Sequence, residues 1–106
     1  MRPTLAALLP TVLLATVATG PAQASLALAQ KHACVACHAV DKKLVGPSYQ
    51  DVAKKYAGQK DAVDKLKASI KAGGSGKWGP VPMPAQPNLS DADLTALATW
   101  VAAGGK

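Results

Sequence analysis

Apolar side chains recur at helical spacing in three stretches of the second half of the chain. They are Val52 and Tyr56 in residues 48–58, Val63, Leu66 and Ile70 in residues 61–74, and Leu94, Leu97 and Val101 in residues 90–104. Residues three, four or seven apart share one face of an α-helix, so each stretch predicts a helix with a buried face. Ser90 begins the last stretch, Asp93 follows at the reciprocal capping position, and a glycine closes each stretch.

A further helix is expected over residues 25–36, with Ser25 as its cap and with Leu26 and Leu28 on or near its buried side. Gly46-Pro47 then interrupts the chain before the stretch at residues 48–58. No segment alternates apolar and polar residues with the period of two that a half-buried strand requires. The pattern therefore predicts an all-α fold of about four helices.

A loop rich in glycine and proline, GGSGKWGPVPMPAQPNL at residues 73–89, separates the last two predicted helices. A loop of this length in a small domain is unusual unless it has a function. Its prolines favour an extended backbone that cannot become a helix. We call this segment the strap, and we expect it to carry Trp78 and Met83 across a surface.

The N-terminus has the pattern of a secretory signal peptide. Arg2 precedes an apolar run over residues 5–18, which is followed by a small-x-small cleavage pattern at residues 22–24. The run is too short, and too interrupted by polar residues and proline, for a bilayer span of about 20 residues; an uncleaved membrane anchor is the alternative. We expect a signal peptide at residues 1–24 and one domain at residues 25–106.

The domain that cleavage would leave is small and basic. It keeps 82 of the 106 residues and contains no Phe, which is near the size at which an apolar core needs a staple or a cofactor. The full chain has a formal net charge of +6, and loss of Arg2 leaves +5. Export argues against a nucleic-acid partner. Most lysines lie among aspartates, on what we expect to be solvated helix faces.

The two cysteines and a histidine form the motif C-V-A-C-H, at Cys34, Cys37 and His38. On a helix these side chains, at i, i+3 and i+4, point at one object. The spacing is the attachment signature of c-type haem, with two thioether bonds and the imidazole as an iron ligand. A thioredoxin-like dithiol would lack its βαβ setting. A zinc site would also need His32 and would crowd four ligands into seven residues, and a disulfide would be a mis-assembled state.

The iron of such a haem needs a sixth ligand or a vacancy. Met83 is the only methionine that remains after cleavage, and it lies in the middle of the strap. Buried methionine usually fills gaps in a core, but combined with the haem motif its position predicts a sulfur ligand opposite His38. His32 lies too close to the proximal side to reach the opposite face, so we expect a surface role for it.

The chain resembles a family on these residues: the small class I c-type cytochromes of the bacterial periplasm. The resemblance runs through CVACHAVDKKLVGPSYQDVAKKYAG, IKAGGSGKWGPVPMP and LATWV, and covers essentially all of the expected domain. It implies a small all-α cytochrome c fold, wrapped around one covalent haem c with its iron, in which the strap bears the axial methionine. It also implies a periplasmic electron carrier, not an enzyme, that shuttles single electrons between respiratory partners.

The same resemblance implies three further contacts. Pro47 would offer its carbonyl to the ring N–H of His38, which fixes the tautomer and orientation of the ligand. Trp78 would donate its indole N–H to a haem propionate, and Gln86 would lie near the sulfur of Met83.

Two positions depart from the family pattern. Ala29 stands where members often carry an aromatic residue against the last helix, and a close approach of the two helices would compensate. Ser69 stands where some members carry a basic residue near the propionates, which leaves the pH dependence of the reduction potential open.

Redox partner proteins are expected to be a respiratory complex as donor and a terminal oxidase or reductase as acceptor. They would meet a monomer that has no stable membrane insertion and, with ferric haem, a net charge of about +4, so we expect acidic docking faces. The lysines nearest the expected haem edge are Lys31, Lys42, Lys43 and Lys77, whereas Lys54, Lys55, Lys60 and Lys65 are expected to serve solubility. The open alternatives are a haem peroxidase or gas sensor without methionine ligation, and a membrane-tethered subunit.

Overall fold

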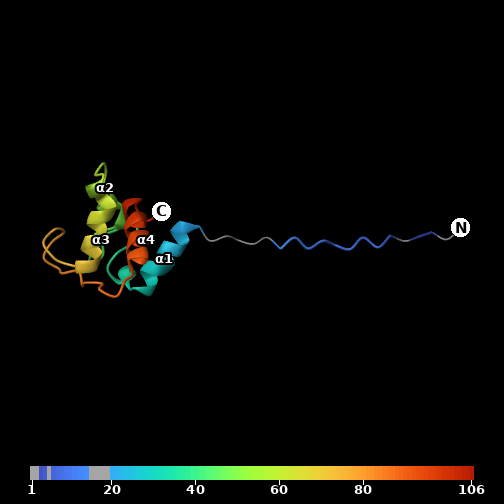
Figure 1. Ribbon diagram of the computed structural model, residues 1–106, viewed down its shortest axis with the longest axis horizontal. Helices are drawn as coiled ribbons and strands as arrows, with labels where there is room; N and C mark the ends of the chain where they lie inside the picture. The colour runs from blue at the N-terminus through green and yellow to red at the C-terminus, as the bar shows by residue number, and fades with distance from the viewer. Residues whose placement is uncertain (1–2, 5, 15–19) are drawn as a thin grey trace.

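The fold is made of helices and loops, as the apolar pattern predicts (Figure 1). The computed structural model describes residues 3–4, 6–14 and 20–106. The elements are α1 at Pro21–Lys31, a single 3₁₀ turn, η1, at Cys34–Ala36, α2 at Tyr49–Tyr56, α3 at Ala62–Ala72 and α4 at Asp91–Ala102. No strand occurs in these ranges. Residues 1–2, 5 and 15–19 of the expected signal peptide lie outside the described residues.

Helices α2 and α4 begin at serine caps. The Ser48 hydroxyl accepts a hydrogen bond from the backbone N–H of Asp51 at 3.0 Å, and Ser90 accepts one from Asp93 at 3.1 Å. Each cap satisfies a donor that the first helical turn leaves without a partner. The predicted start of the last helix is thereby confirmed, and Gly73 follows the end of α3 with φ 64° as its predicted terminator.

The prediction for α1 is wrong at both ends. The helix begins at Pro21, where the fixed φ of proline suits the first turn. Ser25 is therefore a buried residue inside the helix and not its cap. The side of the helix that packs carries Ser25 and Ala29; Leu28 is partly buried against the core as predicted, whereas Leu26 is exposed.

Helix α1 also ends before the cysteine motif. Ala33 has φ 60°, in the left-handed region, and the α-helical ladder stops at Lys31. Cys34 therefore starts a separate 3₁₀ turn, in which Cys37 and His38 donate their backbone N–H groups to its carbonyl. A 3₁₀ turn repeats every three residues, so Cys34 and Cys37 still project from the same side.

Replacing Ala33 with Gly should stabilise the haem-loaded protein. A left-handed conformation costs a non-glycine residue about 1–2 kcal/mol. Glycine removes this cost, but its greater conformational freedom in the unfolded chain lowers the stability of the folded state by about 0.4–1 kcal/mol. We therefore expect the free energy of unfolding to rise by about 0.5–1 kcal/mol. Thermal unfolding measures this gain as a higher Tm, by about 4–8 °C per kcal/mol for a domain of this size. Ala36→Gly is the matched control in η1, where φ is not positive, and should destabilise. A lower Tm in Ala33→Gly would show that the positive φ of Ala33 does not destabilise the folded protein.

The hydrophobic core forms around α4, which packs against α1, α2 and α3. Its buried members are Ala29, Tyr49, Val52, Tyr56, Leu66, Leu89, Leu94, Leu97, Ala98, Trp100 and Val101. Ala29 on α1 and Ala98 on α4 are both 0% exposed. Small residues on two contacting helices permit a close approach of the backbones, which agrees with the compensation expected for Ala29. The remaining side of the core opens into a cavity.

Candidate functional site

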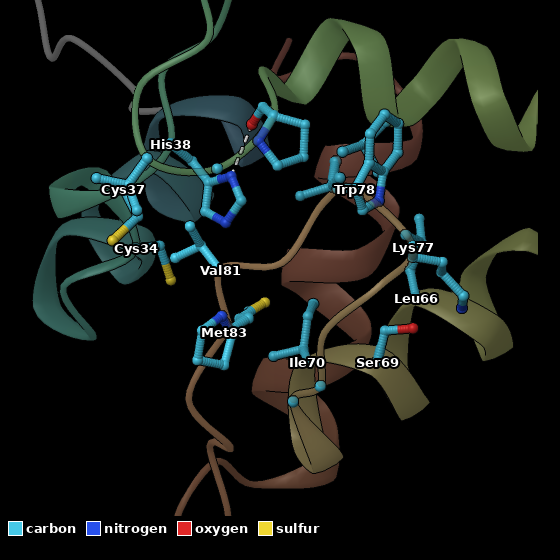
Figure 2. A pocket seen from close by; sticks show the side chains of 18 of the residues that line it. Cys34, Cys37, His38, Leu66, Ser69, Ile70, Lys77, Trp78, Val81 and Met83 are labelled. Atoms are coloured by element: carbon cyan, nitrogen blue, oxygen red, sulfur yellow. Dashed lines mark hydrogen bonds between the residues drawn. The ribbon is translucent and has the colours of Figure 1, made fainter.

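A cavity of about 370 Å³ lies between η1, α2, α3 and the strap (Figure 2). Its wall is mostly apolar, and it includes the thiols of Cys34 and Cys37, the imidazole of His38 and the thioether of Met83. The only charged side chains that line it are those of Lys43 and Lys77, and none of the described lining residues is acidic. Pockets of this size and character are typical of cofactor sites.

The two thiols project from one end of the cavity (Figure 2). Cys34 and Cys37 are free and half-buried. Burial raises the pKa of the Cys34 thiol, and a backbone hydrogen bond partly opposes this shift. Two thiols on one 3₁₀ turn are thus held beside a common space, as covalent attachment to one molecule requires.

The His38 ring is fixed on the side that faces away from the cavity. Its Nδ1 lies 2.7 Å from the carbonyl oxygen of Pro47, and because a carbonyl only accepts, Nδ1 carries the proton. The other nitrogen, Nε2, then keeps a free lone pair, as a metal-binding histidine needs. Gly46 closes over the ring, since a Cβ at this position would lie 2.5 Å from Cε1 of His38.

Tyr49 supports the imidazole from α2. Its ring stacks on that of His38, with centroids 5.6 Å apart and planes at 28°, and contacts Trp100 at 4.8 Å. Both Tyr49 and Trp100 line the cavity, and the Tyr49 hydroxyl and Trp100 Nε1 are buried without a protein partner. Burial, followed by the charge of Cys34, raises the pKa of Tyr49 to about 12, so the hydroxyl is neutral at pH 7. Tyr49 was not predicted as a site residue, because a tyrosine on a helix carries no distinctive signal.

Met83 reaches the cavity from the strap (Figure 2). Its backbone exchanges two hydrogen bonds with Gly74, of 3.0 Å and 2.8 Å. Gly73 packs against the same segment so closely that a Cβ would collide with the Met83 carbonyl oxygen. Hydrogen bonds and steric fit therefore hold the backbone of Met83 in place, in addition to the expected stiffness of the prolines.

Gln86 anchors the strap to α3. Its backbone N–H lies 3.2 Å from the carbonyl of Ile70 and 3.1 Å from that of Lys71. The side chain is half-buried and is not among those that line the cavity.

Trp78 forms part of the cavity wall while 41% of its surface stays exposed. Lys55 Nζ lies 4.4 Å from the centroid of the Trp78 ring, a cation–π contact, and donates a hydrogen bond to the Lys77 carbonyl at 3.3 Å. Lys55 is exposed, as a solubility charge should be, and it also contacts the strap, which was not predicted. The cause is the fold of the strap, which brings residue 78 over α2.

His32 follows the last turn of α1 and does not line the cavity. The side chain is half-buried, and Nε2 is buried without a hydrogen-bond partner, so the expected surface role is only partly correct. Among the residues that the structure describes, no three His, Cys, Asp or Glu side chains gather closely enough to hold a metal ion. The zinc alternative thus lacks its ligand set.

The residues of the cavity fit a flat macrocycle that carries vinyl groups and a central iron. The thiols stand at one end, a free imidazole nitrogen faces the space, and a thioether enters from the strap. Because Gly46 has no side chain, the His38 ring has the space that a Cβ would take.

Of the helices in the described part of the chain, none has the length and apolar character that a membrane crossing requires.

Comparisons with known proteins agree with this geometry. The sequence model of the cytochrome c family matches residues 22–104. The chain is 60% identical to cytochrome c-552 of Hydrogenobacter thermophilus over 74 residues, which cover 70% of this chain and 74% of that protein. It is 51% identical to cytochrome c-552 of Nitrosomonas europaea over 87 residues, covering 82% and 84%. The crystal structure of wild-type Nitrosomonas europaea cytochrome c552 superposes with a TM-score of 0.72 at 49% identity, over 74% of this chain and 98% of that one.

Proposed function

Because the chain belongs to the cytochrome c family, we propose that His38 and Met83 are the iron ligands of a haem that Cys34 and Cys37 hold covalently. The chain is a small class I c-type cytochrome, an electron carrier with covalent haem c and its iron, and not an enzyme. One observation carries the proposed site: two free thiols, an oriented imidazole and a thioether line one apolar cavity.

The cysteines would hold the haem as thioethers. Addition of each S–H group across a vinyl double bond needs a free thiol, which Cys34 and Cys37 both have. Two bonds from one 3₁₀ turn would fix the cofactor beside His38, the next residue in the chain.

His38 and Met83 would fill both axial positions. Pro47 accepts the hydrogen bond from Nδ1 of His38, which in the neutral ring leaves the lone pair on Nε2, and Gly74 holds Met83 through two backbone hydrogen bonds. Bound in this way, the haem supplies an iron that takes up and releases one electron. Methionine and histidine together raise the reduction potential. Two rigid protein ligands also leave no open position for a substrate.

Trp78 and Gln86 would complete the surroundings. Trp78 lines the cavity at the end away from the cysteines (Figure 2), where its indole N–H would donate to a haem propionate. Gln86 lies three residues beyond Met83 and ties the strap to α3. We propose that its amide lies near the Met83 sulfur when the site is loaded.

The carrier would work in the periplasm as a monomer. The N-terminal pattern supports removal of residues 1–24 as a signal peptide, which would leave a domain at residues 25–106. Its donor would be a respiratory complex, and its acceptor a terminal oxidase or reductase. Exposed lysines, Lys43 at the cavity and its neighbour in sequence Lys42 among them, would steer it toward acidic docking faces.

Electron transfer to fractions of the native periplasm and membrane tests this proposal. Protein purified from the periplasm should have the mass of residues 25–106 with one haem, and its reduced form should be oxidised by at least one fraction. The rate should fall as salt rises through about 0.1 M, where the Debye length is about 10 Å. Charge reversal of Lys42 and Lys43 to Glu should lower the low-salt rate by about 10-fold or more.

The matched control reverses Lys54 and Lys60, which are also exposed and lie on or beyond α2, away from the lining of the cavity. This variant should change the rate much less. A rate that is flat in salt would reject steering by lysines, whereas failure of every fraction to oxidise the protein would count against the carrier itself.

A further inference from the structure

The cavity has two chemically different ends (Figure 2). Cys34 and Cys37 mark one end, and Ser69, Lys77 and Trp78 lie at the other. The lining of the described structure contains lysines but no carboxylate. A mostly apolar cavity with cations and without anions suits a ligand that is flat, apolar and negatively charged at one edge.

Lys77 is the cation at the end away from the cysteines. Its Nζ lies 3.3 Å from the Tyr56 hydroxyl and 6.0 Å from the centroid of that ring. Within the described ranges Lys77 forms no ion pair, whereas Lys65 and Lys67 pair with Asp61 and Asp91. The ammonium group of Lys77, an exposed residue, thus contacts a neutral partner at the cavity, and no carboxylate of the described residues pairs with it.

Lys55 fixes the position of this end of the strap. Its ammonium group sits over the Trp78 ring and donates to the Lys77 carbonyl. The backbone of Lys77 and the indole of Trp78 are therefore held by one side chain of α2. On α3, the polar group that faces the same end is the Ser69 hydroxyl, which carries no charge.

Haem carries its two vinyl groups and its two propionates at opposite edges of the macrocycle. This step rests on the proposed function, in which the two thiols bond to the vinyl groups. The propionate carboxylates must then lie at the end of the cavity formed by Trp78 and Lys77. A carboxylate that enters an apolar cavity needs a charged or hydrogen-bonding partner. Trp78 offers one neutral donor, and Ser69 another.

We propose that Lys77 is the cationic partner of the haem propionates, with Lys55 as the residue that positions it. Through a short shift from the Tyr56 hydroxyl, the Lys77 ammonium forms a charge-assisted hydrogen bond to a propionate. Ser69 on α3 stands where some family members carry a basic residue near the propionates. Lys77 supplies the positive charge from the strap instead. The charge also favours the ferrous state over the more positive ferric state, and so raises the reduction potential.

The contact has a second consequence, for the pH dependence of the potential. With the cysteines converted to thioethers, the titratable side chains that line the cavity are His38, Lys43, Tyr49, Tyr56 and Lys77. Among these, Lys77 is the cation at the end where the propionates would enter (Figure 2), and Lys55, which does not line the cavity, is a second charged group beside it. A neighbouring cation lowers the pKa of a carboxyl group. Removal of the Lys77 charge should therefore raise the pKa of the propionate. The potential should then change with pH at a higher pH than in the wild type.

Redox titration of the haem-loaded protein across pH, with Lys77→Gln and Lys77→Met, tests this inference. Lys77→Met keeps the apolar stem, so a loss of packing cannot account for a shift shared by both variants. The control is Lys54→Gln, which removes the same charge from an exposed position that does not line the cavity. We expect both Lys77 variants to lower the potential at least twice as much as the control and to raise the pH of the transition. Lys77→Arg should restore values near those of the wild type.

Equal shifts in the Lys77 variants and in Lys54→Gln, or an unchanged transition pH, would overturn the role of Lys77. Those outcomes would leave the carrier function intact, because the haem would still be attached and redox-active. Failure of the proposed function is distinguishable, since the wild-type protein itself would then lack covalent haem or methionine ligation.

Discussion

Replacing Cys34 or Cys37 with Ala should leave mostly apo-protein that is largely unfolded. Without a cofactor the cavity of about 370 Å³ has nothing to fill it. At about 24 cal/mol per Å³, a dry cavity of that size would cost at most roughly 9 kcal/mol. That upper bound is comparable with the whole folding free energy of a small domain, about 5–15 kcal/mol. The haem is therefore expected to be part of the core.

Haem staining after denaturing electrophoresis, together with far-UV circular dichroism, measures this loss. Ser75→Ala is the matched control, because Ser75 also lines the cavity but offers no thiol; it should keep the haem and the helical signal. Folded single-cysteine variants with a wild-type Tm would show that the thioethers contribute little to folding. Release of the haem from the wild-type protein by acid-acetone extraction would contradict covalent attachment altogether.

Replacing Met83 with Ala should open the sixth position of the iron while the haem stays attached. The backbone bonds between Gly74 and residue 83 do not depend on the side chain, so the strap should keep its course. The potential should fall by on the order of 0.1 V or more, because axial ligands spread haem potentials over about 0.8 V. Cyanide should bind quickly to the ferric variant and slowly to the wild type.

Val81→Ala provides the comparison, because Val81 lines the same cavity from the same strap and carries no ligand atom. It should keep the potential and the slow binding of cyanide. A Met83→Ala variant with wild-type potential and ligand exclusion would identify Met83 as a packing residue, and an open-site haem protein would then become the better account.

Helix positions could be predicted from the sequence where the features that start and end a helix lie next to it in the chain. Serine caps and glycine terminators act on neighbouring residues, so α2, α3 and α4 lie where the pattern of Val52, Leu66 and Leu97 places them. Helix α1 departs from its prediction because alanine normally favours a helix, and nothing in the sequence around Ala33 signals a left-handed conformation. The turn that presents Cys34 and Cys37 imposes that conformation.

The cofactor was predictable from a five-residue motif, and the structure brings the predicted Cys34, Cys37, His38 and Met83 to one cavity, because each of these residue types is rare in this chain. The supporting contacts were less so. Gly46 was interpreted as a turn residue, yet its missing side chain makes room for the His38 ring. Gly73, at the start of the strap, packs against residues 83–85 of the same segment, and Lys55 of α2 contacts Trp78 more than 20 residues further along the chain. Such contacts depend on how segments meet in space, which helical periodicity does not encode.

The absorption spectrum of the ferric protein tests the central claim most directly, in the region of the weak methionine-to-iron charge-transfer band. We expect this band in the wild type and in Val81→Ala, and its loss in Met83→Ala with the haem still attached. A wild-type protein without the band, or a Met83→Ala variant that keeps it, would contradict ligation by Met83.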